Sequence, residues 1–490
     1  MNRYAEDTVP IRIVHRHYPV SLDGMRMPEY DPPTEVMPAF MDWPTQKLPI
    51  ITKPPPAEPV SRVRELLGVA RDIAYVSFGK YGQYLVTVAT LPLMARVLGT
   101  EGLGLLAIGM SSYFIGSLLV DLGITSYMAA RVQESSETRS PAEQTASINR
   151  TRGTYLVIRG GILGAVTLAL AVVLAVGAPE YLRMIALGLF IGGVWSMSED
   201  WLLIGQGRFG ASTLYQAVAR IAYLLLLVLV LPRIPTAEVA LLCLLGNSVL
   251  CVALTWWDTW RGFGPPGRPR GVVALLRASA PVVTGRLLVT SYGQGSATVF
   301  GAVLNAASLG LYSASDRLVR AVQSLLDAIG FALLPRMAKR GGDERFWPDA
   351  LRALTVCVGL ACAASALLWL LAPVVVPLIF GDQFAEAVAV LRLEVLILPA
   401  TTITSFITTA ILPVRQDTIG VLIGALVGTC IAGVALLIAA RTHSVWTLVG
   451  GIVAAEFAVA LWYLARTRGL IVRERAAGGP LPAGAERRTR

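Results

Sequence analysis

Residues 71–121 read RDIAYVSFGKYGQYLVTVATLPLMARVLGTEGLGLLAIGMSSYFIGSLLVD, and a related stretch follows later in the chain. Aligned without a gap, they fall on residues 277–327. The matches pair Arg71 with Arg277, Gly79-Lys80 with Gly285-Arg286, Leu103-Gly104-Leu105 with Leu309-Gly310-Leu311, and Asp121 with Asp327. Matches between apolar residues arise easily by chance in such a chain. It is much less expected by chance that a basic residue, the glycine before it and a lone aspartate all match in one register. We therefore predict two homologous halves, an arrangement typical of transporters.

The composition indicates a membrane protein. Hydrophobic residues make up 54% of the 490 residues and charged residues 15%. In soluble proteins roughly a quarter of the residues are charged. A helix of about 20 apolar residues crosses a bilayer core of about 30 Å. Segments of that kind fill the chain from about residue 74 to 467. The sequence therefore predicts an all-α polytopic membrane protein.

We expect twelve transmembrane helices, six in each half, around a central cavity. The predicted spans are 74–96, 103–128, 154–177, 181–204, 212–232, 237–259, 279–303, 310–335, 351–374, 386–412, 418–440 and 446–466. Alternate loops carry most of the arginines, which places those loops and both termini in the cytoplasm. This bias accounts for the net charge of +10 without a nucleic-acid partner.

The spans divide the chain into five predicted parts. These are a disordered proline-rich cytoplasmic tail (1–60), an N-lobe with an interfacial helix and six spans (61–259), a basic linker (260–278), a C-lobe (279–467) and a basic tail (468–490). The first tail is interpreted either as a solvated segment or as a docking site for a partner protein.

Polar residues inside the spans follow single helix faces. In span 310–335 they are Tyr312, Asp316, Arg320, Gln323 and Asp327, at steps of three or four residues. Similar stripes in both halves predict a hydrated cavity, and hydrogen bonding between helices is the alternative. Pro399 predicts a kink in span 386–412.

Buried cations are the main candidates for substrate binding. The hypothesis is a cationic cavity, and its residues are Lys80, Arg220, Arg286, Arg317 and Arg320. Lys80 and Arg286 occupy matching positions of the two halves, which suits an anion with two charged centres such as a diphosphate. The alternative is that Lys80 pairs with Asp121, and Arg286 with Asp327, inside each half.

Carboxylates inside the spans are the candidates for ion coupling or counter-charge. The set is Asp121, Asp327 and Glu394. Glu199-Asp200 is expected to form a local salt bridge with Arg208. No catalytic set, metal site or cofactor motif is visible, so we expect a transporter rather than an enzyme.

Several motifs resemble a known family. Arg96-Val-Leu-Gly99, Gly102-Leu-Gly104 and Asp121-Leu-Gly123 are similar to the first two spans of O-antigen-type polysaccharide flippases, members of the multidrug, oligosaccharidyl-lipid and polysaccharide exporter superfamily. Leu309 to Ala314, with Pro335, resembles spans seven and eight, and Asp200-Trp201 with Gly205 resembles the end of span four. The resemblance covers about residues 62–470.

This resemblance implies a function. A flippase of this kind moves a polyprenyl-diphosphate-linked oligosaccharide from the inner to the outer leaflet of the bacterial inner membrane by alternating access. Its partners would be that glycan lipid, the membrane lipids and, through residues 1–60, enzymes of polysaccharide synthesis. The alternatives are an ion-coupled multidrug exporter and a flippase of the peptidoglycan precursor.

Overall fold

The computed structural model describes residues 59–122, 132, 141–273, 275–277, 296–339, 346–415 and 417–476. The side chains of residues 59–89 and 328–339 lie outside this description. Residues 1–66 and 67–490 form two separate units. The described part of the first unit, from Pro59 to Leu66, is helical, and the text below concerns the second unit. The predicted terminal tails, 1–60 and 468–490, lie mostly outside the described residues.

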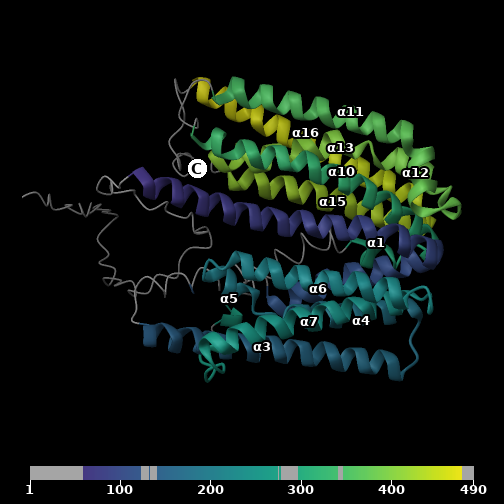
Figure 1. The fold of residues 1–490 in the computed structure, drawn as a ribbon. Coiled ribbons are helices and arrows are strands. Elements are labelled where there is room, and N and C mark those ends of the chain that lie inside the picture. The colour runs from purple at the N-terminus through teal and green to yellow at the C-terminus, as the bar shows by residue number, and fades with distance from the viewer. Residues whose placement is uncertain are drawn as a thin grey trace, which may run out of the picture. The chain divides into compact units, whose positions relative to one another are not determined.

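Helices make up almost all of the described chain (Figure 1). The earlier ones are α1 (Pro59–Asp121), α3 (Pro141–Ala175), α4 (Glu180–Trp195), α5 (Asp200–Gly205), α6 (Phe209–Val230) and α7 (Ala237–Phe263). The later ones are α9 (Ser296–Phe300), α10 (Ala306–Lys339), α11 (Phe346–Phe380), α12 (Ala387–Glu394), α13 (Ile397–Phe406), α14 (Leu412–Arg415), α15 (Thr418–Thr442) and α16 (Val445–Ala476). We call residues 67–263 the first half and 296–476 the second half. Helices α3 to α7 pack on one another, as do α10 to α16.

Nine of the described helical segments are long and apolar enough to cross a membrane. The predicted spans 74–96 and 103–128 are joined in α1, which is interrupted at Gly99. Gly99 has a φ of 70°, in the left-handed region that glycine enters without steric cost. Most of the predicted span 279–303 lies outside the described residues. The chain is thus a multi-pass membrane protein, and the count of twelve stays a prediction.

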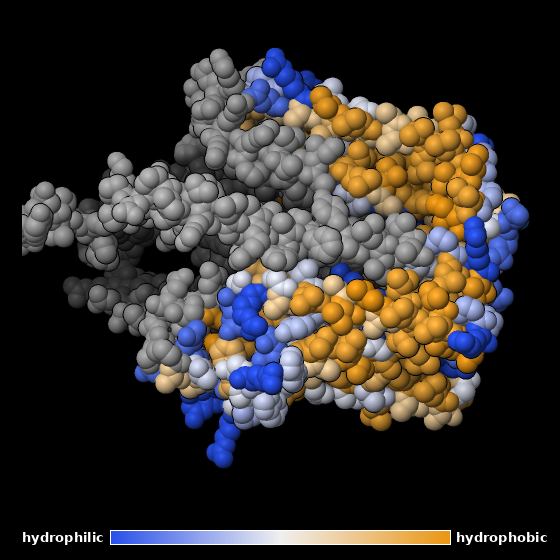
Figure 2. Space-filling view, in the orientation of Figure 1, coloured by the Kyte–Doolittle hydropathy of each residue, from blue (hydrophilic) through white to orange (hydrophobic). Residues whose placement is uncertain are grey.

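The turns of the second unit gather at two ends. At the Gly99 end, the Gln383 amide donates to the carbonyl of Ala95 (3.0 Å), and His443 contacts the carbonyl of Val303 (2.9 Å). At the Asp121 end, Tyr155 of α3 donates to the Asp121 carbonyl, and the last turn of α7 contacts residue 199. Between these ends, apolar side chains of α6 and α11 are exposed. Figure 2 shows apolar residues gathered between the ends on both sets of helices, as contact with lipid tails requires.

The predicted kink at Pro399 is confirmed. The helix is interrupted between Glu394 and Ile397, so α12 and α13 are separate. Proline has no backbone N–H and cannot bond to the carbonyl four residues earlier, which is that of Val395. The hydroxyl of Ser365 on α11 donates to this carbonyl instead, at 3.0 Å.

Asp417 begins α15 at the Asp121 end and has strong donors. Its carboxylate accepts from the Arg466 guanidinium at 2.6 and 2.9 Å and from the backbone N–H of Gly420 at 3.0 Å. Burial favours the neutral acid, but these donors outweigh it and hold the pKa of Asp417 below its ordinary 3.8. The carboxylate therefore stabilises the fold at pH values above 3.8, and this contribution is lost as the pH falls through the lowered pKa of the folded state.

We expect Asp417→Asn to lower stability by about 1.5–3 kcal/mol at pH 7, because bonds to a charged group are lost. The difference from the wild type should shrink as the pH falls from 4 toward 2. Thermal unfolding in detergent across this range measures it, with the exposed Asp382→Asn as control. A difference that stays constant with pH would contradict the assigned role of the carboxylate.

Candidate transport site

A cavity of about 460 Å³ lies among the helices of the first half. Aromatic side chains form part of its wall, including Tyr113, Trp195 and Trp201. Its charged lining residues are Asp121, Arg159, Asp200 and Arg220, from α1, α3, α5 and α6. The cavity thus brings together two of the predicted site residues, Asp121 and Arg220, in the membrane-spanning part of the chain.

Asp121 and Arg159 form an ion pair at one side of this cavity. Their closest atoms, Oδ1 and Nη2, are 2.8 Å apart. The Tyr155 hydroxyl donates to the same Oδ1 at 2.7 Å, and the centroid of its ring is 3.9 Å from the central carbon of the Arg159 guanidinium. Arg159 also donates to the carbonyl of Ser198 at 2.9 Å. These contacts hold both charges in fixed positions.

Asp200 and Arg220 are connected through an amide. Gln216 donates from Nε2 to Asp200 at 3.0 Å and accepts at Oε1 from Arg220 Nη2 at 3.2 Å. Ser212 donates to the other oxygen of Asp200 at 3.2 Å. Gln216 and Arg220 are four residues apart on α6, so both side chains lie on the same helix face. The described lining therefore has two cations and two acids, each held by neighbouring polar groups.

Asp200 reaches the cavity because a helix is interrupted just before it. Helix α4 ends at Trp195, and α5 begins at Asp200. The intervening residues are bonded to two other helices. The hydroxyl of Ser196 donates to the Ser117 carbonyl on α1 at 2.7 Å, and the indole of Trp256 on α7 donates to the Met197 carbonyl at 2.7 Å. The interruption also leaves the Ser198 carbonyl free to accept from Arg159.

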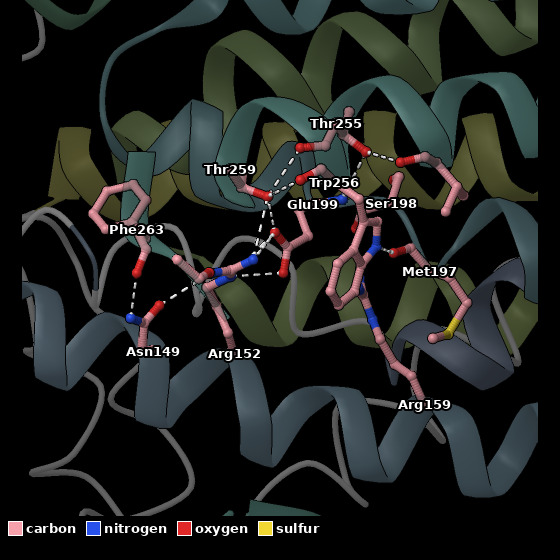
Figure 3. A network of polar contacts seen from close by, with 12 residues as sticks. Asn149, Arg152, Arg159, Met197, Ser198, Glu199, Thr255, Trp256, Thr259 and Phe263 are labelled. Carbon is pink, nitrogen blue, oxygen red and sulfur yellow. Dashed lines mark hydrogen bonds and ion pairs between the residues drawn. The ribbon is translucent and has the colours of Figure 1, made fainter. Parts of the chain in front are cut away.

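Glu199, which is not among the residues lining the cavity, anchors this interruption (Figure 3). Its carboxylate accepts from Arg152 at 2.8 Å on each oxygen, and the two side chains are 3% and 0% exposed. The remaining donors of Arg152 go to Asn149 Oδ1 (3.0 Å) and the Gly264 carbonyl (2.7 Å), and Thr259 also donates to Glu199. Helices α3 and α7 and the α4–α5 connection are thereby joined.

The predicted salt bridge of Glu199-Asp200 with Arg208 is wrong. Arg208 pairs with Asp258 on α7 at 2.8 Å. The end of α4 at Trp195 changes the direction of the following residues, so Glu199 points to α3 and α7 while Asp200 faces α6. A prediction based on sequence distance alone does not include that change of direction.

The other predicted residues with described side chains lie on α10 and α12, outside the lining of this cavity. Arg320 pairs with Asp316 one helical turn away (2.8 Å), and Arg317 donates to the sulfur of Met110 on α1 (3.3 Å). Glu394 is 1% exposed, near Asp316 and Arg320. Neither of its carboxylate oxygens accepts from an N–H or hydroxyl of the described residues, and the Asp316 carboxyl lies within hydrogen-bonding reach of it.

The remaining predicted residues are only partly covered. One oxygen of Asp327, Oδ1, likewise has no partner among the described residues. Lys80 lies on α1, but its side chain is outside the description, as is the whole of Arg286. The alternative pairings of Lys80 with Asp121 and of Arg286 with Asp327 therefore stay open.

Arg159 is a site residue that the sequence analysis missed. It is an isolated charge in the predicted span 154–177 and belongs to no polar stripe. The signal was the charge itself: an arginine at a helix centre costs about 2.5–3.5 kcal/mol on insertion scales, so a buried partner was to be expected.

A helical membrane protein with a charged cavity inside its bundle has the architecture of a membrane transporter. Residues 69–340, more than half of the chain, match the family model described as Polysaccharide biosynthesis protein. The chain belongs to this family, as the sequence resemblance predicted. A putative O-antigen transporter of Escherichia coli (strain K12) is 21% identical over 347 residues, which cover 67% of this chain and 79% of that protein.

Solved structures show the same fold. The lipid II flippase MurJ in an inward closed conformation matches with a TM-score of 0.62 and 14% identity, over 81% of this chain and 87% of MurJ. A multidrug resistance MATE family transporter of the MOP superfamily, in its inward-facing conformation, matches with a TM-score of 0.50 and 15% identity, over 78% of this chain and 94% of that one. The chain thus shares the fold of these two transporters.

Proposed function

We propose that the protein is a flippase that moves a polyprenyl-diphosphate-linked oligosaccharide from the inner to the outer leaflet for cell-surface polysaccharide synthesis. The observation that carries the proposal is the charged cavity of the first half, with Arg159 and Arg220 facing a space of about 460 Å³. A guanidinium can bind phosphate oxygens bidentately. The family and the putative O-antigen transporter support a glycan-linked cargo.

In this proposal the diphosphate binds to Arg220 together with Lys80 and Arg286. The carboxylates Asp121 and Asp327 compete with the diphosphate for the cations and so allow release, and Asp121 is already paired with Arg159 of the same cavity. The halves act as two six-helix lobes that rock between inward and outward access, with both termini in the cytoplasm of a bacterium. Arg317 and Arg320 belong to the exit side, and residues 1–60 dock enzymes of polysaccharide synthesis.

The test is mass spectrometry of polyprenyl-linked lipids after depletion of the protein, with surface polysaccharide measured in parallel. A diphosphate-linked oligosaccharide should accumulate while one polymer is lost. Accumulation of the peptidoglycan precursor would identify the cargo as that lipid instead. Unchanged lipids together with new sensitivity to cationic drugs would favour a multidrug exporter.

Glu394 is the proposed coupling residue, because its buried carboxyl lies beside the Asp316 carboxyl and is therefore suited to hold a proton. We expect Glu394→Gln to fold and to lose most of the dependence of transport on an ion gradient, since an amide can neither release a proton nor offer a charge. Transport into inverted vesicles, with and without an imposed gradient, measures this. Glu386→Gln, an exposed position beside α12, is the matched control. An unchanged gradient dependence in Glu394→Gln would exclude this residue.

A further inference from the structure

Two glycines from equivalent positions of the halves meet at the Gly99 end. In the alignment of the repeats, Gly104 corresponds to Gly310 and Thr100 to Ala306. A Cβ added to Gly104 would lie 1.8 Å from the Ala306 carbonyl oxygen, and one added to Gly310 would lie 1.9 Å from the Thr100 carbonyl oxygen. Each half therefore makes the same contact to the other, with the roles of the residues exchanged.

This contact depends on the absence of a side chain. Cβ atoms essentially never approach another heavy atom to within 3.0 Å, so any other residue at Gly104 or Gly310 would push the two backbones apart. The obstructing atoms are backbone carbonyl oxygens, which cannot rotate away as a flexible side chain does. Only glycine allows α1 and the start of α10 to cross at this distance, as in closely packed membrane helices.

Further contacts between the halves surround the glycines. Ser112 and Thr298 are hydrogen-bonded through their hydroxyls at 2.9 Å. Gln383 donates to the Ala95 carbonyl at 3.0 Å, and Arg96 donates to the Leu378 carbonyl at 2.5 Å. At the Asp121 end, no hydrogen bond joins the two halves among the described residues. The described contacts between the halves are thus concentrated at one end.

We propose that Gly104 and Gly310 form a gate that closes the Gly99 end, and that closure depends on this symmetric backbone contact rather than on the polar bonds beside it. The role of the gate in transport rests on the proposed function. Closure itself is independent of any cargo and can be measured without one. Because the repeat places one glycine in each half, an alanine at either position should open the same end.

Cysteines in place of Ser112 and Thr298 report closure, since the two hydroxyl oxygens are 2.9 Å apart. The full-length protein would carry this pair after replacement of its five native cysteines, with a protease site inserted within residues 133–140. After an added oxidant and proteolysis, the fragments stay joined only where the disulfide has formed. The parent should cross-link rapidly, and Gly104→Ala and Gly310→Ala should each slow cross-linking severalfold.

Two other glycines are matched controls. Gly153 lies on α3, and a Cβ there would be 1.8 Å from the Gly267 carbonyl oxygen, so Gly153→Ala introduces an equal clash away from the glycines and from Ser112 and Thr298. Gly359 has nothing within 4 Å of an added Cβ. Both variants should cross-link at the parent rate. Slowing in Gly153→Ala equal to that in Gly104→Ala would overturn the proposal, because general loosening would then explain both.

A second comparison does not depend on the folding of the glycine variants. Arg96→Ala combined with Gln383→Ala removes the neighbouring polar bonds without adding volume, and cross-linking should persist. Its loss would overturn the proposal, as would unchanged cross-linking in folded Gly104→Ala and Gly310→Ala. Export of surface polysaccharide is measured separately. Cross-linking that behaves as expected, without any effect on export, would reject the proposed function and leave the gate in place.

Discussion

Replacing Arg152 with alanine should destabilise the protein by about 3–5 kcal/mol, the usual effect of removing one partner of a buried ion pair. The variant leaves the Glu199 carboxylate, 3% exposed, without its bidentate partner. The Gly264 carbonyl and Asn149 lose a donor as well. The α4–α5 connection would no longer be held against α3 and α7. We expect little folded protein in the membrane, as measured by size-exclusion chromatography in detergent and by thermal unfolding.

Arg208→Ala is the matched control. Arg208 lies at the same end of the molecule and pairs with Asp258, but its side chain is 45% exposed. Its cost should be at most about 1 kcal/mol, as for other surface pairs. Replacing both buried partners, Arg152→Met with Glu199→Leu, should recover part of the stability, since no unpaired charge remains. Equal stability of Arg152→Ala and Arg208→Ala would show that the buried pair is not needed.

Arg220→Ala should reduce transport by roughly tenfold to a hundredfold, because a charge-assisted bond worth about 1.5–3 kcal/mol is lost. The residue is half-buried at the cavity wall, where its Nη2 contacts Gln216. Arg220→Lys should retain part of the activity, since a lysine keeps the charge but not the planar fork. Transport of the lipid-linked glycan into inverted vesicles is the measurement, at matched amounts of folded protein.

Arg233→Ala serves as the control for this loss, as Arg233 is exposed at the Gly99 end and donates to the Leu229 carbonyl of its own turn. It should transport like the wild type. If Arg220→Ala and Arg220→Lys lose the same activity while both remain folded, a role based on charge alone is excluded. If neither loses activity, the cavity of the first half is not the cargo site.

Local chemistry explains what could be predicted from the sequence. Apolar segments of spanning length identified the membrane protein, since a bilayer imposes that length on any helix that crosses it. Pro399 predicted an interruption because a missing N–H acts within one turn. Asp121 and Arg220 were predicted at a central cavity between the halves, whereas both line a cavity within the first half, so the central cavity stays a prediction.

The unpredicted features depend on the rotation of helices about their axes. Whether Arg159 faces lipid or Asp121 is set by packing between α1, α3 and α4, and no local pattern encodes it. The interruption at residues 196–199 contains no proline and only becomes favourable through donors from other helices, such as Trp256. The partner of Glu199 lies 47 residues earlier in the chain, so sequence proximity suggested Arg208 instead.

The network around Arg152 also constrains the order in which the protein can be made. Arg152 is synthesised before its two side-chain partners Glu199 and Thr259. Thr259 follows Arg152 by 107 residues. Until α7 has left the ribosome, the guanidinium has no complete set of acceptors and is more stable in contact with water or lipid head groups than in the apolar interior. We therefore expect the polar interior around Arg152 to be completed only after α7 has emerged.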